Sequence, residues 1–135
     1  MTVVELAAII AAVLIAAAAA FQVALALGVP LGGATMGGRA PTVNGVLTPP
    51  FRVVAVLSAI TLLIGAWVVL ARAGVVDAGF LGRDLLGWIA WATVAFLALN
   101  TLSNLSGRHP LERWGMSSLT LVVALLIGYV ALNAP

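Results

Sequence analysis

The chain has 135 residues, of which 64% are hydrophobic and 7% are charged, and its mean hydropathy is +1.24. Soluble domains carry about a quarter charged residues, so this composition excludes a water-soluble globular protein and requires the bilayer as solvent. The absence of cysteine excludes disulfides, thiolate catalysis and thiolate metal ligation. The length allows one transmembrane domain over residues 1–135. The net charge of +2 comes from arginines that indicate on which side of the membrane each loop lies, and it does not indicate nucleic-acid binding.

The first apolar segment predicts a retained membrane helix over about residues 3–27. No basic side chain precedes it, whereas a signal peptide has a basic start and a shorter apolar core. Thr2 and Glu5 have the spacing of a capping box. In this motif the threonine hydroxyl accepts a hydrogen bond from the backbone amide of the third helical residue, and the glutamate carboxylate accepts one from the backbone amide of the cap residue. Gly28 and Pro30 are typical of a helix end.

A long connection rich in glycine and proline, residues 28–50, follows the first helix. Loops of this length without regular structure are often functional or disordered. Its low charge argues against disorder, so we expect it to fold against the membrane surface or to enter the bundle. Thr48-Pro49-Pro50 at its end is typical of a helix start, because proline needs no amide partner there.

Three further apolar segments predict helices over about residues 50–72, 85–106 and 110–133. Asp84 is the expected cap of the third helix, and His109 with the proline after it precedes the fourth. The sequence therefore predicts an all-α, four-helix transmembrane bundle with up-down topology and a long first loop.

The arginines predict the orientation of this bundle. The first and third loops and their helix ends carry four arginines against one acid, whereas the opposite side carries two arginines against three acids. The four are Arg39, Arg52, Arg108 and Arg113. The positive-inside rule then places the first and third loops in the cytoplasm and both termini outside.

Polar side chains gather on one face of the third helix, at about 100° per residue. The polar residues on this face are Thr93, Asn100, Ser103 and Asn104, and Phe96 lies on the same face. Trp88 and Trp91 lie away from it, near the end of the helix, where aromatic side chains face the lipid headgroups. The other helices carry small residues on one face, which allows close helix packing in membranes.

Polar residues of the four helices also share one depth. At about 1.5 Å per residue, the layer lies about 10 Å inside the predicted cytoplasmic side. Its members are Gln22, Ser58, Asn100 and Ser117, with Ser103 and Asn104 nearer the surface. This arrangement predicts a polar pocket that opens toward the first loop. The alternative is interhelical packing, because such groups also hydrogen-bond across membrane helices for about 0.6 kcal/mol each.

The sequence offers little support for catalysis. No ionisable residue lies in the middle of a span, where ion-coupled transporters carry one. The glycine pairs of the first loop lack the lysine and hydroxyl of a phosphate-binding loop. His109 and Glu112 are three residues apart at a helix start, a spacing that suits a cap as well as a site.

Two stretches, FQVALALGVPLGG (Phe21–Gly33) and LNTLSNLSGRHPLERWGMSSLT (Leu99–Thr120), resemble an uncharacterised family of small four-span bacterial integral membrane proteins. The resemblance implies a multi-pass protein of the bacterial inner (plasma) membrane and brings no activity with it. The positions that carry it are Phe21, Gln22, Leu27, Gly28, Pro30, Gly32, Asn100, Thr101, Asn104, Glu112, Arg113 and Met116.

We predict a non-enzymatic membrane protein whose cytoplasm-facing pocket binds or moves a lipid or small amphiphile, without cofactor or metal. Its expected ligand-binding residues are Gln22, Ser58, Asn100, Ser103, Asn104 and Ser117, with Arg39, Arg108 and Arg113 at the mouth. The alternative is an accessory subunit of a larger membrane complex, in which the polar layer only fixes packing. An intramembrane enzyme based on His109 and Glu112 ranks third. The expected partners are membrane lipids, and a homo-oligomer is compatible with either leading hypothesis.

Overall fold

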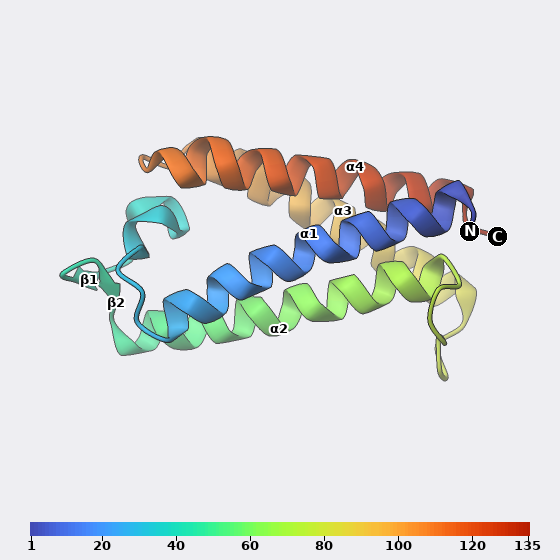
Figure 1. The fold of residues 1–135 in the computed structure, drawn as a ribbon, viewed down its shortest axis with the longest axis horizontal. Helices are drawn as coiled ribbons and strands as arrows, with labels where there is room; N and C mark the ends of the chain where they lie inside the picture. Colours follow the sequence, from blue (N-terminus) through green and yellow to red (C-terminus); the bar gives the residue numbers. More distant parts are fainter.

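Four helices, each long and apolar enough to cross a membrane, make up the bundle in the computed structural model, which describes all residues 1–135. The first three are α1 (Val3–Ala26), α2 (Pro49–Arg72) and α3 (Arg83–Leu105). The fourth crossing begins with a π-helical segment, η3 (Leu111–Met116), and continues as α4 (Ser117–Asn133). The predicted all-α, four-helix transmembrane fold is confirmed, and the chain runs up and down through it (Figure 1).

The starts of α1 and α2 follow from local chemistry. Glu5 N donates to Thr2 Oγ1 at 3.1 Å and Thr2 N donates to Glu5 Oε2 at 2.7 Å, so the predicted capping box is confirmed. Pro49 and Pro50 occupy the first positions of α2, where their missing amides cost nothing. Thr48 precedes them with an extended backbone, but its side chain makes no capping hydrogen bond.

The predicted cap of α3 was wrong by two residues. Gly82 is the cap, with the extended backbone of that position, and Arg83 is already helical. Glycine is accepted at a helix cap. Asp84 therefore lies within the first turn, where its carboxylate faces the positive end of the helix dipole instead of capping it.

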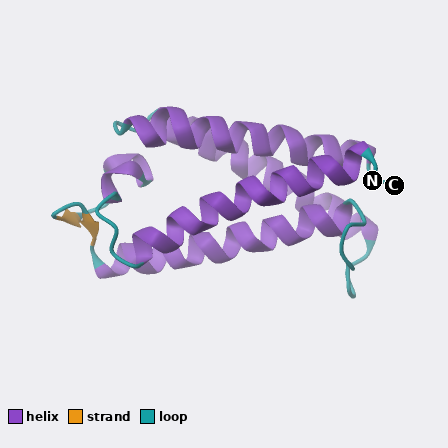
Figure 2. Cartoon of the chain, in the orientation of Figure 1, coloured by secondary structure: helices purple, strands orange, loops and turns teal.

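The helices form two hairpins, α1–α2 and α3–α4. Both termini and the α2–α3 connection lie at one end of the bundle, and the α1–α2 loop and the α3–α4 turn lie at the other (Figure 1). The hairpins lie close together at the end with the termini. They diverge toward the other end, and a helical turn of the long loop lies between them there (Figure 2).

The main apolar core fills the half of the bundle that carries the termini. It consists of Ala7, Ala8, Ala11, Ile15, Ala66, Val69, Ala73, Ala90, Leu97, Val123, Ala124, Ile127, Val130 and Ala134. Ala8 and Ala11 are completely buried, so the small-residue face predicted for the first helix is its contact face. Because lipid is as apolar as these side chains, close backbone approach and dispersion contact stabilise the bundle here.

The long loop is folded. It contains two 3₁₀ turns, η1 (Gly32–Ala34) and η2 (Met36–Gly38), and an antiparallel pair, β1 (Thr42–Val43) and β2 (Val46–Leu47), seen in Figure 2. Asn44 and Gly45 join the strands with φ of 51° and 81°, the positive values that a two-residue hairpin turn requires. Gly32 of η1 packs closely against Thr42 of β1. A Cβ on Gly32 would lie 2.7 Å from Thr42 Cγ2, so this close approach requires a glycine.

Candidate functional site

A cavity of about 460 Å³ lies between the two hairpins at the end where they diverge. All four crossings and the two 3₁₀ turns of the long loop contribute to its wall. Its polar lining residues are Gln22, Thr35, Ser58, Thr61, Asn100, Ser103, Asn104, Glu112 and Thr120. The volume falls within the range of about 300–1,000 Å³ typical of small-molecule sites.

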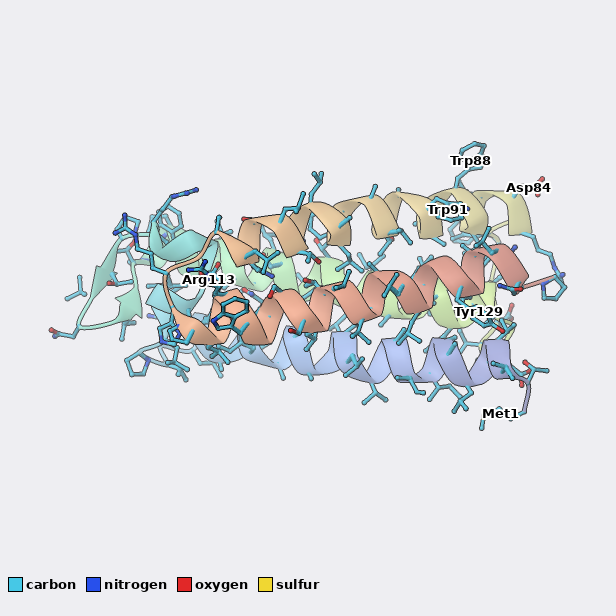
Figure 3. The ribbon with its side chains drawn as sticks, turned by 90° about the horizontal axis from the view of Figure 1, so that it is seen from above. Met1, Asp84, Trp88, Trp91, Arg113 and Tyr129 are labelled. Carbon is cyan, nitrogen blue, oxygen red and sulfur yellow. The ribbon has the colours of Figure 1, made fainter.

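Five of the nine residues predicted from the sequence line this cavity. They are Gln22, Ser58, Asn100, Ser103 and Asn104. The helical period and the depth count therefore placed side chains from three different helices around one hollow. Trp88 and Trp91 are 75% and 42% exposed, so they face away from it as expected, and Figure 3 shows Trp88 extending outward from the bundle.

Ser117 was predicted to join this layer, but it does not line the cavity. It is buried, and its hydroxyl donates to the carbonyl of Arg113 in the preceding turn. The π-helical winding of η3 changes the register, because its bonds span five residues rather than four. Thr120 is the α4 hydroxyl that reaches the cavity wall.

The three arginines predicted at the mouth also lie outside the lining. Arg39, Arg108 and Arg113 are exposed at the loop end of the bundle. The guanidinium carbon of Arg113 lies 5.2 Å from the ring centre of Trp114, and Figure 3 shows Arg113 at the end opposite Met1. Their positive charge therefore lies outside the cavity, at the loop end of the bundle.

Four polar residues of the lining were not among the predicted ligand-binding residues, namely Thr35, Thr61, Glu112 and Thr120, and Glu112 is the charged one. It is 1% exposed and lines the cavity, although its position near a helix start suggested the surface. Its Oε1 accepts a hydrogen bond of 2.8 Å from Gly37 N in η2, and its Oε2 has no hydrogen-bond partner. The sequence signal was a lone acid at the start of an apolar segment, and nothing in it indicated the π-helical winding.

Gly107 and His109 support the position of Glu112. A Cβ on Gly107 would lie 2.5 Å from Glu112 Oε2, so any other residue at this position would displace the carboxylate. His109 Nδ1 accepts from Leu111 N at 3.1 Å, which makes the histidine a cap of the fourth crossing. Glu112 does not complete the predicted i, i+3 pair with His109, because its carboxylate accepts from Gly37 N instead.

One hydrogen bond joins side chains of two helices beside the cavity. Thr101 Oγ1 of α3 and Thr120 Oγ1 of α4 are 2.8 Å apart, and both residues are buried. Ser58 and Thr61 instead donate to carbonyls of their own helix at 2.9 Å. The polar groups of α1 and α2 therefore do not tie the hairpins together at this depth.

A second, apolar hollow of about 250 Å³ continues from the cavity between α2 and α3. The two hollows have four lining residues in common, Thr61, Leu62, Phe96 and Leu97. Ile64 and Phe96 of the second hollow are 56% and 49% exposed, so this hollow faces the surrounding bilayer.

Four spanning helices around a polar hollow define a multi-pass integral membrane protein. Comparison with protein-family models, curated proteins and solved structures finds no match for this chain. Its function must therefore be inferred from the geometry and chemistry of the cavity.

Proposed function

We propose that this membrane protein binds or moves a lipid or small amphiphile in the cavity between its two hairpins. The observation that carries the proposal is a hollow of about 460 Å³, lined by polar side chains inside an otherwise apolar bundle. Binding requires no covalent chemistry, so the proposed role is non-enzymatic.

Unpartnered polar atoms support a ligand rather than packing alone. Gln22 Oε1 and Glu112 Oε2 are buried without a hydrogen-bond partner. Buried polar groups are normally satisfied, because an unmet group costs about 1–3 kcal/mol. Packing alone would pair such groups across the helices, as Thr101 and Thr120 do. A bound ligand, or water in its absence, would satisfy the remaining groups.

Each lining residue then has a definite role. Gln22, Asn100 and Asn104 offer amide donors and acceptors to a headgroup, and Ser58 and Ser103 offer hydroxyls. In this proposal the three exposed arginines of the loop end attract anionic headgroups at the membrane surface, for about 1 kcal/mol each. These arginines assist the first contact with the bilayer and do not contact the ligand in the cavity.

Native mass spectrometry of the protein extracted with its own lipids tests this proposal. The wild type should retain one lipid or amphiphile at fixed stoichiometry, and the double variant Gln22→Leu, Asn100→Leu should lose it. Ser118→Leu makes the same polar-to-apolar change at an exposed position outside the cavity lining, and should retain it.

Two results would contradict the proposal. A wild-type protein released without any bound amphiphile would remove its basis. Retention of the same molecule by the double variant would place the ligand elsewhere. Co-release with larger, different subunits would favour the accessory-subunit alternative.

A further inference from the structure

We propose, on the basis of the proposed function, that the bound amphiphile carries a protonated amine. Glu112 and Gln22 hold the ammonium group in the polar cavity, and the alkyl chain lies in the apolar hollow between α2 and α3. This assigns a headgroup class to the site, and it assigns to Glu112 the role of its charged partner.

The shape of the hollow space matches a molecule with one polar and one apolar end. The polar cavity and the apolar hollow meet at Thr61, Leu62, Phe96 and Leu97. From there the apolar hollow extends past Gly65, Val68 and Ile89 along α2 and α3. A headgroup in the first space therefore has its chain directed into the second, which faces the hydrocarbon of the bilayer.

The charge of the lining favours a cation. Glu112 is the only ionisable residue in the wall of the cavity. An ionised carboxylate offers acceptors only, and one of its oxygens is free of any hydrogen-bond partner. A buried carboxylate is costly unless it is paired, and an ammonium group supplies both the opposite charge and the missing donors.

No arginine lines the cavity beside that carboxylate. The guanidinium carbon of Arg39 lies 3.6 Å from where a Cβ of Gly37 would be, but this side chain is exposed and does not line the cavity. Arg52 Nε donates to the carbonyl of Ala26 at 2.6 Å, at the end of α1. A headgroup that carries a phosphate or carboxylate but no amine would instead meet Glu112 without a lining arginine or lysine, and like charges repel.

The bond from Gly37 to Glu112 also has a structural role, because it holds the long loop over the cavity. That role uses Oε1 alone. Oε2 packs beside Gly107, where a Cβ would lie 2.5 Å away, and it has no hydrogen-bond donor. The loop-holding bond therefore leaves one acceptor of this lining residue without a partner.

Four probes with a twelve-carbon chain separate charge from hydrogen bonding. They are dodecylamine, dodecyltrimethylammonium, monododecanoylglycerol and dodecanoate, each titrated into the protein in neutral maltoside micelles and followed by native mass spectrometry. We expect dodecylamine to bind most tightly, because only it combines the positive charge with N–H donors. Glu112→Gln should weaken dodecylamine about tenfold or more and leave monododecanoylglycerol almost unchanged.

Two control variants keep this test specific. Asp84→Asn removes an exposed carboxylate at the other end of the bundle and should leave dodecylamine binding unchanged. Gln22→Leu removes the second unpartnered acceptor and should weaken dodecylamine without touching the loop contact of Glu112. The Gln22→Leu variant therefore still tests the amine assignment if the Glu112→Gln variant fails to fold.

The amine has two natural sources, an aminophospholipid of the membrane or a soluble single-chain amine. Competition of dodecylamine by phosphatidylethanolamine, but not by phosphatidylglycerol, would support the first, and failure of both lipids to compete would support the second. Equal binding of all four probes, with no effect of Glu112→Gln and Gln22→Leu, would overturn the amine assignment and leave the cavity as a general amphiphile site. Absence of saturable binding by every probe would overturn the proposed function as well.

Discussion

The two halves of this bundle are built from the same four crossings and differ in how they fill the space between them. The half with the termini contains the main apolar core, in which alanine, valine and isoleucine side chains pack closely. In the half with the long loop, the hairpins diverge around the polar cavity. Small residues stabilise one half by close contact, whereas the other half keeps space open that its own side chains do not fill.

The long loop explains how the open half persists. Leu47 of β2 packs with Leu25 and Ala55 in a small separate core that secures the loop to the α1–α2 hairpin. Gly37 N then donates to Glu112 and connects the same loop to the other hairpin. The loop is therefore a spacer attached on both sides, and the cavity lies beneath it.

The largest effect is expected in the half with the main apolar core. Ala11→Leu introduces three carbon atoms at a completely buried position, and overpacking of this kind costs about 1–3 kcal/mol, occasionally more. We expect a clear loss of thermal stability in detergent, monitored by circular dichroism. Ala16→Leu, on the exposed face of the same helix, should have almost no effect. Equal effects of the two variants would contradict the assignment of the contact face.

A smaller loss is expected where the spacer meets the α3–α4 hairpin. Gly107→Ala places a Cβ 2.5 Å from Glu112 Oε2 and should cost about 1 kcal/mol or more as the carboxylate shifts. Gly33→Ala is the matched control, because nothing lies within 4 Å of its Cβ position. Hydrogen exchange at Gly37 should increase in the first variant and stay unchanged in the second. Similar exchange in both would contradict the role of the carboxylate in holding the loop.

The cross-helix bond should have a measurable but modest coupling. A double-mutant cycle with Thr101→Val and Thr120→Val should give a coupling free energy of about 0.6 kcal/mol, the average for such bonds in membranes. The free energy of unfolding can be followed in mixed micelles by titration with sodium dodecyl sulfate. A coupling free energy of zero would mean that the two hydroxyls do not contribute as a pair.

The smallest effect on stability is expected in the cavity lining itself. Gln22→Leu removes an amide whose Oε1 has no partner, so the free energy of unfolding of the ligand-free protein should stay within about 0.5 kcal/mol of the wild type. Delipidated protein in the same micelles provides the measurement. A loss of more than about 1 kcal/mol would favour the interpretation of the polar layer as interhelical packing.

The fold could be predicted from the sequence because the bilayer restricts it so strongly. Length and hydropathy predict the four crossings, and the helical period predicts which face of each helix turns inward. The prediction that Gln22 and Asn100 lie at one depth was possible because, in a straight helix, the depth of a residue follows from its number of residues from the helix end. Both residues line the cavity. The hairpin of the long loop also has a local signal, Asn44-Gly45, which was not used in the sequence interpretation.

The rest of the site depended on features that a regular count does not describe. Ser117 turned out of the predicted layer and Glu112 turned into the cavity wall, because η3 is wound as a π-helix. The position of the long loop relative to the α3–α4 hairpin depends on one contact, Gly37 to Glu112, between residues 75 apart in the chain. Neither local propensity nor periodicity encodes such a contact.

The most direct test of the central claim is saturable photo-crosslinking in lipid nanodiscs. The probe is dodecylamine with a diazirine in its chain, and the labelled residues are identified by peptide mass spectrometry. We predict labelling concentrated in residues 61–68 of α2 and 89–97 of α3, suppressed by excess unlabelled dodecylamine. Labelling spread evenly over the lipid-facing surface, and unaffected by the competitor, would contradict the claim that the cavity and the apolar hollow that continues from it hold an amphiphile.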